Sequence, residues 1–421
     1  MLSVDKLPDG RDARLRSREM PGEGQRESLI ADRAGPDGAG AMNFDINSVF
    51  VVTESPEEAW AMADSKKQAS ERSGDKRGKA LALIKATEAL VLMMKLDVAA
   101  NQVMEAQAIC EELKYEEGRA AAMNAMAKIY VASGGDEEDI ERGEDLVQDA
   151  LVIFRKLGNK RGEAATLMTL SGVMAAMQNF EAAIKAAKDA QALFQEIGDR
   201  GAVAALYHEI SKVHVLKANT SSAIKALLKA RAIQIELGDK RKEGECMLAV
   251  GKVEAAGRDA AKATAALTTA GELFKEAGDH KGAASAMNVR MDMHLEAKRI
   301  VEAVAAAKLV VTINHDAGDL KGEAEGLTKL AEILLNNENV AQAYKLAETA
   351  AKIAASVQDR AGIEKAYDML AKCKNGRLKQ EIKESIKTYE GLANYPVDPI
   401  IEPGLNKIAL EQYFDVVQKG L

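Results

Sequence analysis

Histidines, cysteines and paired carboxylates are the residues of this chain that could do chemistry, and their spacing argues against it. His208 and His214 are six residues apart, whereas a helical zinc site needs histidines four apart so that both face the metal. Six residues turn a helix by about 240°, so these two side chains diverge. The three cysteines, Cys110, Cys246 and Cys373, are scattered and have no histidine or second cysteine at ligand spacing. We expect no catalytic residue, no metal, no cofactor and no enzymatic activity.

A charged, glycine-rich phrase recurs along the chain but lacks the spacing of a phosphate-binding loop. Clear copies are Gly74–Gly78, Gly158–Gly162 and Gly278–Gly282, and a Walker motif would separate its glycines by four residues. The first glycine of the phrase can adopt the left-handed conformation that ends a helix. The following Asp or Asn is a good N-cap for the next helix. We therefore interpret the phrase as a turn between two helices.

The phrase recurs with a period of 40 residues, which predicts a solenoid. Its first residues are 158, 198, 238, 278, 318 and 358, with earlier copies at 74 and 114. A fixed period of this size is typical of stacked helix pairs that bury their apolar faces against their neighbours. The seven helix pairs expected from the period are 79–113, 119–156, 162–196, 202–236, 242–276, 282–316 and 322–356, followed by a single helix at 362–373.

Small residues recur at two positions, seven apart, in the second helix of each pair. One series is Ala99, Gly143, Ala183, Ala223, Ala263, Ala303 and Ala343. The other is Ala106, Ala150, Ala190, Ala230, Ala270, Val310 and Ala350. Such a ladder predicts close approach of backbones wherever helices cross.

This pattern resembles that of tetratricopeptide repeat (TPR) proteins over residues 79 to about 373. The family pattern has a large residue, a leucine three residues later and then a small residue in the first helix, and two alanines seven apart in the second helix. This sequence matches it at Leu167, Leu170, Ser171, Ala183 and Ala190. The 40-residue repeat is similar to those of Pins-type G-protein-signalling modulators and kinesin light chains. The resemblance implies a right-handed superhelical α-solenoid of antiparallel helix pairs, about seven pairs with flanking cap helices.

Two departures from the family pattern concern the first helix of the repeat. The usual tyrosine is kept only as Tyr130, and His214 and His294 occupy the same slot in later repeats. There we expect packed, hydrogen-bonded histidines. Arg290 stands where leucine is normal, so we expect the sixth pair to be looser or specialised.

The flanks divide the chain into further segments. Residues 1–41 lack any hydrophobic period and are expected to be a disordered tail, unless Met42 is the true start. Residues 42–74 are expected to hold a short apolar run within 43–55, docked as an extended segment, and a cap helix. The repeat array is expected over 75–376. Residues 377–421 are expected to form a C-terminal cap helix and a proline-containing tail, with a short amphipathic helix at 405–417.

Composition restricts the class of partner and the compartment. The net charge of −8 and pI near 5.5 argue against a nucleic-acid or anionic-membrane binder. No apolar run approaches the length of a transmembrane helix. Scattered cysteines indicate reduced thiols and a cytoplasmic location. The sequence leaves the oligomeric state open.

The TPR resemblance implies that first-helix residues line a concave groove that binds a protein or peptide segment. Row one of this groove is Asn124, Met168, His208, Leu248, Asn288 and Thr328. Row two, four residues further along, is Lys128, Gly172, Lys212, Lys252, Asp292 and Glu332, with Glu296 and Asn336 extending it. Row two changes from lysines to carboxylates, so we expect a groove that is basic early and acidic late. Ordinary solvated side chains would explain the same residues.

Three functions remain open on these observations. The first is a non-enzymatic interaction scaffold, or adaptor, that binds a partner segment in the groove. The second is a self-inhibited or self-associating protein whose C-terminal tail occupies that groove. The third is a ligand sensor or enzyme, for which the residues give little support. The lysine and asparagine arrangement with which chaperone-binding TPR proteins clamp a C-terminal carboxylate is not reproduced.

Overall fold

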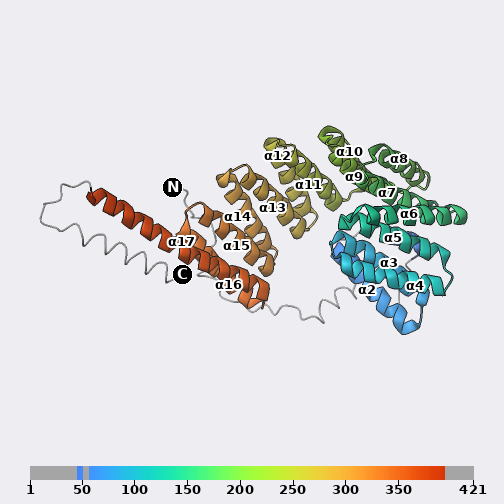
Figure 1. The fold of residues 1–421 in the computed structure, drawn as a ribbon, viewed down its shortest axis with the longest axis horizontal. Coiled ribbons are helices and arrows are strands. Elements are labelled where there is room, and N and C mark those ends of the chain that lie inside the picture. Colours follow the sequence, from blue (N-terminus) through green and yellow to red (C-terminus); the bar gives the residue numbers. More distant parts are fainter. Residues whose placement is uncertain (1–44, 51–55, 394–421) are drawn as a thin grey trace. The chain divides into compact units, whose positions relative to one another are not determined.

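The computed structural model describes residues 45–50 and 56–393, with side chains described to residue 376 except those of Ser48 and Phe50. Helices account for nearly all of this part of the chain, and it contains no strand. The all-α, TPR-like solenoid of helix pairs is therefore confirmed (Figure 1). The expected tail at 1–41 and the expected helix at 405–417 lie outside the described residues.

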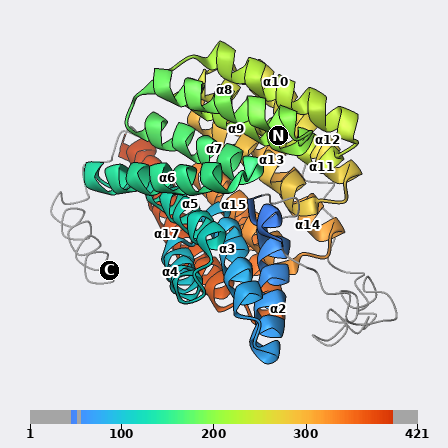
Figure 2. The same cartoon turned by 90° about the vertical axis from the view of Figure 1, so that its right-hand side faces the viewer.

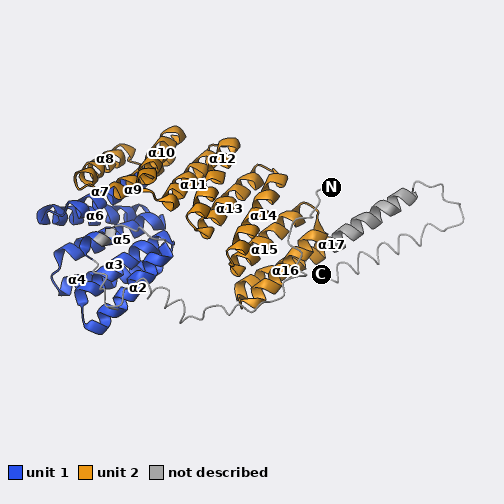
Figure 3. Ribbon diagram, turned by 180° about the vertical axis from the view of Figure 1, so that it is seen from behind, with its two compact units in different colours: residues 1–177 blue, residues 178–421 orange. Residues whose placement is uncertain are grey.

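The chain forms two compact units, residues 1–177 and 178–421 (Figure 3). Unit 1 contains η1 (Ile46–Phe50), α2 (Pro56–Ser73), α3 (Lys76–Leu92), α4 (Leu96–Glu112), α5 (Glu116–Ser133), α6 (Glu137–Leu157) and α7 (Lys160–Ala176). Unit 2 contains α8 (Phe180–Glu196), α9 (Arg200–Leu216), α10 (Thr220–Leu237), α11 (Lys240–Ala256), α12 (Ala260–Glu276), α13 (His280–Glu296), α14 (Ile300–Asp316), α15 (Leu320–Asn336), α16 (Val340–Ser356) and α17 (Arg360–Ala393). We call α3, α5, α7, α9, α11, α13 and α15 the first helices, and α4, α6, α8, α10, α12, α14 and α16 the second helices.

The repeated phrase ends one helix and begins the next, as the sequence predicts. Gly238 ends α10 in the left-handed region at φ +73°, where an L side chain would be strained. Asp239 then caps α11, because its side chain accepts a hydrogen bond from the Lys242 amide at 2.9 Å. Inside the repeats the turn residue is glycine at Gly134, between α5 and α6, but not in the other described pairs, where Arg258, for example, takes φ +63°.

The last glycine of the phrase has a packing role. A Cβ at Gly282 would lie 2.5 Å from the Phe274 ring, and one at Gly162 would lie 2.5 Å from the Phe154 ring. Both phenylalanines are almost fully buried. The aromatic end of one second helix therefore rests on the glycine that opens the following first helix.

Gly282→Ala is accordingly expected to lower the free energy of unfolding by about 1–3 kcal/mol, because the added methyl group overpacks the Phe274 contact. Gly201→Ala is the matched control in another copy of the phrase, where the nearest atom would lie at 3.6 Å. The control should leave stability unchanged or raise it by up to about 1 kcal/mol. Urea unfolding followed by circular dichroism compares the two, and equal effects would refute the packing role.

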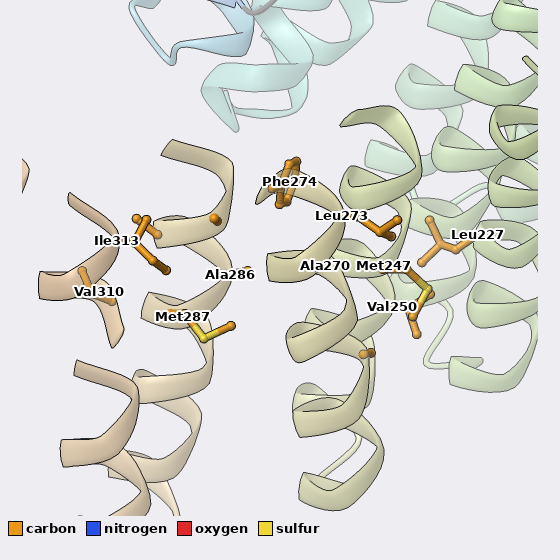
Figure 4. Close-up of a cluster of buried hydrophobic side chains, with 13 residues drawn as sticks. Leu227, Met247, Val250, Ala270, Leu273, Phe274, Ala286, Met287, Val310 and Ile313 are labelled. Carbon is orange, nitrogen blue, oxygen red and sulfur yellow. The ribbon is translucent and has the colours of Figure 1, made fainter. Parts of the chain in front are cut away.

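The core of each repeat is the alanine ladder with larger apolar side chains around it. Ala223, Ala230 and Ala263 are fully buried, as the spacing predicts. In unit 2 the same layer joins Leu227, Met247, Val250, Ala270, Phe274, Met287 and Ile313 into one cluster (Figure 4). The cluster draws on α10 to α14, so each pair of helices is completed by its neighbours.

Ion pairs follow the repeat along its edge. Lys76 pairs with Glu112 and Arg200 with Glu236, in each case joining the start of a first helix to the end of its second helix. Arg241 reaches the capping Asp279 of the following phrase at 3.1 Å. These three basic residues of the phrase thus have structural partners, which makes them poor candidates for a ligand site.

Two flanking elements differ from expectation. The helix expected at 362–373 and the cap helix expected beyond it are one continuous helix, α17, because Gly376 does not interrupt it. The part of the 43–55 segment that the structure describes is a turn of 3₁₀ helix, η1, packed on α3, α5 and α7, rather than extended chain.

Candidate functional site

In unit 2 the first helices present three rows of side chains on one face. Rows one and two are those defined above, and an outer row precedes row one by three residues. Positions i, i+3 and i+7 share a face of a helix. The outer row of unit 2 is Ala205, Glu245, Ser285 and Glu325, and all four are exposed. We call these three rows the first-helix face.

The early part of row two in unit 2 is basic. Lys212 and Lys252 are both exposed. Lys212 pairs with Glu209 one turn before it, at 2.7 Å, and an exposed pair of this kind contributes little to stability. No carboxylate among the described residues pairs with Lys252. Glu245 in the outer row reduces the local positive charge and lies 3.9 Å from Arg241.

The late part of row two is acidic. Asp292, Glu296 and Glu332 are exposed, as is Asn336 at the end of α15. Partial burial raises the pKa of Asp292; Lys329 opposes that shift and Glu296 adds to it. Like charges gathered on one face favour a partner that brings positive charge.

Row one is half-buried in unit 2 and carries one buried polar atom without a partner. His208, Leu248, Asn288 and Thr328 are all partly exposed. The buried Oδ1 atom of Asn288 has no hydrogen-bond partner in the described part of the chain. An unsatisfied acceptor beside an open face can accept a hydrogen bond from a backbone N–H of a bound segment.

In unit 1, Asn124 is the buried member of these rows, and Lys128, Met168 and Gly172 are half-buried. Asn124 is fully buried, and neither its Oδ1 nor its Nδ2 has a partner among the described residues. Lys128 forms an ion pair with Glu88, one repeat earlier, at 2.7 Å. Glu88 was not singled out by the sequence analysis, and its side chain is only 10% exposed. Lys128 is therefore neutralised in place, and its peptide-binding role stays a prediction.

His208 lies against a cysteine that the sequence spacing did not connect with it. Its Nε2 is 3.2 Å from the Sγ of Cys246, which is 38 residues away, on α11 of the next repeat. Burial lowers the pKa of His208 and raises that of Cys246 to about 12. Both groups are therefore neutral at pH 7, whereas a nucleophilic cysteine needs a depressed pKa.

His294 is packed as expected, but it is not hydrogen-bonded, and that part of the expectation is wrong. The residue is 3% exposed, and neither ring nitrogen has a partner in the described residues. The aromatic slot supplies apolar packing and offers no acceptor to an imidazole. His214 is half-buried, and its Nδ1 also lacks a partner.

The burial of His294 predicts a loss of stability in mild acid. Burial, and then Arg290, lowers the pKa of His294; Arg299 acts in the same direction and Glu302 opposes it. The unfolded state therefore takes up its proton first. The stability that comes from burying the neutral imidazole is fully present above about pH 6.5, the ordinary pKa of histidine. It is lost as the pH falls towards the lowered pKa of folded His294.

Thermal melts of the wild type and of His294→Phe at pH 7.5 and 5.5 test this prediction. The wild type should lose more of its melting temperature on acidification than the variant, which cannot titrate at this position. An equal loss in both chains would contradict the assignment to His294.

Other ligand sites find little support. A surface pocket of about 270 Å³ lies among α8, α9 and α10, and Tyr207 and Arg200 are among its lining residues. Tyr207 already bonds Gln191, and Arg200 already pairs with Glu236. The described residues hold no cluster of three or more histidine, cysteine or acidic side chains fit for a metal ion. None of the described helices combines the length and hydropathy needed to cross a membrane.

Comparisons with known proteins find likenesses in structure alone. No family model matches the chain, and no curated protein matches it in sequence. One similar solved structure is BtubC from P. vanneervenii, with 17% identity, a TM-score of 0.40, and coverage of 53% of this chain and 93% of that one. A second is the STAND protein with a tetratricopeptide repeat sensor from Pyrococcus horikoshii, with 14% identity, a TM-score of 0.47, and coverage of 84% and 56%. A third is the kinesin light chain TPR-like repeats of Podosopora anserina, with 14% identity, a TM-score of 0.35, and coverage of 54% and 99%.

Proposed function

We propose that this chain is a non-enzymatic interaction scaffold that binds a segment of a partner protein on the first-helix face of unit 2. The observation that carries the proposal is row two, where exposed lysines on α9 and α11 give way to exposed carboxylates on α13 and α15. A partner segment that matches this row has acidic residues near α9 and α11 and basic residues near α13 and α15.

The neighbouring rows support a bound segment rather than a bound small molecule. Row one offers half-buried apolar and polar side chains, among them Leu248 and the unpartnered Oδ1 of Asn288. The outer row is exposed along all four helices. Affinity would then come from many modest contacts along the face, and the charged contacts would weaken with salt.

Charge reversal on row two tests the proposal. Lys212→Glu with Lys252→Glu is expected to weaken capture of an acidic partner at least tenfold, because attraction is replaced by repulsion. The matched control is Lys225→Glu with Lys345→Glu. These lysines are exposed on the second helices α10 and α16, and their reversal changes the net charge equally.

The measurement is quantitative mass spectrometry of proteins captured from native lysate at low and at high salt. Partners lost with the row-two variant, and kept by the control, support recognition by the first-helix face. Equal capture by both variants, or equal loss from both, would count against it.

A further inference from the structure

Segment η1 lies on the first helices of unit 1. Its packing contacts are with α3, α5 and α7, three successive first helices. In a 3₁₀ helix, residues three apart eclipse one another and share a face. Ile46 and Val49 are three apart, and they are 8% and 0% exposed. Both side chains are therefore directed into unit 1.

The first-helix face is buried on α3 and largely buried on α5, where η1 packs; on α7, Ala165 is buried whereas Met168 and Gly172 are half-buried. On α3 the three rows hold Leu81, Ile84 and Glu88, exposed by 3%, 1% and 8%. On α5 the outer row and row one hold Ala121 and Asn124, at 1% and 0%, and row two holds the half-buried Lys128. The same rows are half-buried or exposed throughout α9, α11, α13 and α15. Helix α3 also lies between α2 and α4 (Figure 2), so η1 completes its burial.

The chemistry of the face changes with this cover. The outer row is apolar in unit 1, with Leu81, Ala121 and Ala165. In unit 2 the same row brings in Glu245 and Glu325. The face in unit 1 is thus suited to aliphatic side chains, which is what η1 supplies.

From these contacts we infer that the first-helix face of unit 1 is a second binding site, held closed by the chain's own residues 45–50. The site takes a short segment with two aliphatic residues three apart, the pattern that Ile46 and Val49 provide. This inference rests on the proposed function, which it extends from unit 2 to unit 1. A partner segment of the same chemistry opens the site by displacing η1.

Competition makes the proposal measurable. A tethered segment competes at an effective concentration in the millimolar range. A free segment therefore binds the closed face with an affinity reduced by the fraction of open molecules. Releasing η1 removes that competition without altering the face itself.

The probe is a fluorescent synthetic peptide with the sequence of residues 43–53, titrated against the full-length chain by fluorescence anisotropy. Ile46→Asp with Val49→Asp should bind the peptide at least tenfold more tightly than the wild type does. The matched control is Val98→Asp with Val152→Asp, which adds the same charge at aliphatic residues 48% and 65% exposed on α4 and α6. The control should bind the peptide as weakly as the wild type.

The inference would be overturned if the wild type, the double variant and the control bound the peptide with equal affinity. It would also be overturned if the Ile46→Asp, Val49→Asp variant kept its helicity and did not bind the peptide. If the double variant loses helicity, Val49→Ala decides in the same assay: tighter binding than the wild type supports the site, and unchanged binding refutes it. The row-two reversal reports on unit 2 separately. If the row-two variant loses its partners but the η1-released chain does not bind the peptide, the second site is refuted and the proposed function of unit 2 stands.

Discussion

Phe274→Ala is expected to lower the free energy of unfolding of unit 2 by about 3–5 kcal/mol. The ring is 2% exposed and belongs to the cluster that joins α10 to α14. It also fills the space above Gly244 and Gly282, where an added Cβ would lie 3.1 Å and 2.5 Å from it. Because glycine has no side chain to move into the vacated space, the cavity cannot collapse fully.

Urea unfolding measures the Phe274→Ala loss, and hydrogen exchange locates it, because stability in a repeat protein is a sum of local terms. We expect lost protection in α12 and α13. Val301→Ala on the neighbouring α14 is the control, since Val301 is 60% exposed and surface changes cost about 0.5 kcal/mol or less. A loss below about 1 kcal/mol for Phe274→Ala would show that the layer repacks.

Lys128→Met is expected to lower the free energy of unfolding by about 2–3 kcal/mol, because it removes the partner of Glu88 in a poorly solvated place. The side chains of Lys128 and Glu88 are only 19% and 10% exposed. The loss is smaller than for a fully buried pair, since some water still reaches both groups. The pair joins α5 to α3, so the effect belongs to unit 1.

Replacing both partners separates two free-energy terms: the cost of leaving one charge unpaired, and the stabilisation that the ion pair itself provides. The double variant, Glu88→Leu with Lys128→Met, should recover most of the stability lost by Lys128→Met alone. Urea unfolding of both single variants and of the double variant completes the cycle. If the losses simply add, Glu88 and Lys128 do not stabilise one another, and the ion pair contributes nothing.

The fold could be predicted because its determinants are local and repeated. The 40-residue period, the turn glycines such as Gly238 and the capping Asp239 lie in one stretch of sequence, and each acts within a few residues of itself. The buried alanine ladder follows from the same period. The packing role of Gly282 was missed, because it depends on where Phe274 places its ring.

The sites could be predicted only in part, because burial and pairing depend on contacts between repeats. Row two in unit 2 has the predicted residues, and they are exposed. The partner of Lys128 is 40 residues away, and that of His208 is 38 residues away. The docking of Val49 on α3, α5 and α7 is a tertiary contact without periodicity. The run of apolar outer-row residues, Leu81, Ala121 and Ala165, is the signal that could have indicated a covered face.

Site-specific photo-crosslinking tests the central claim, that partners bind the first-helix face of unit 2. A photoreactive benzoylphenylalanine replaces Lys252 or Glu332 on this face, or Leu228 or Tyr344 on the second helices, where these are 44% and 37% exposed. The full-length chains are irradiated in native lysate, and crosslinked proteins are identified by mass spectrometry. We predict the same partners from positions 252 and 332, and none of these from positions 228 and 344. Crosslinks that arise equally from both faces, or mainly from the second helices, would contradict the account.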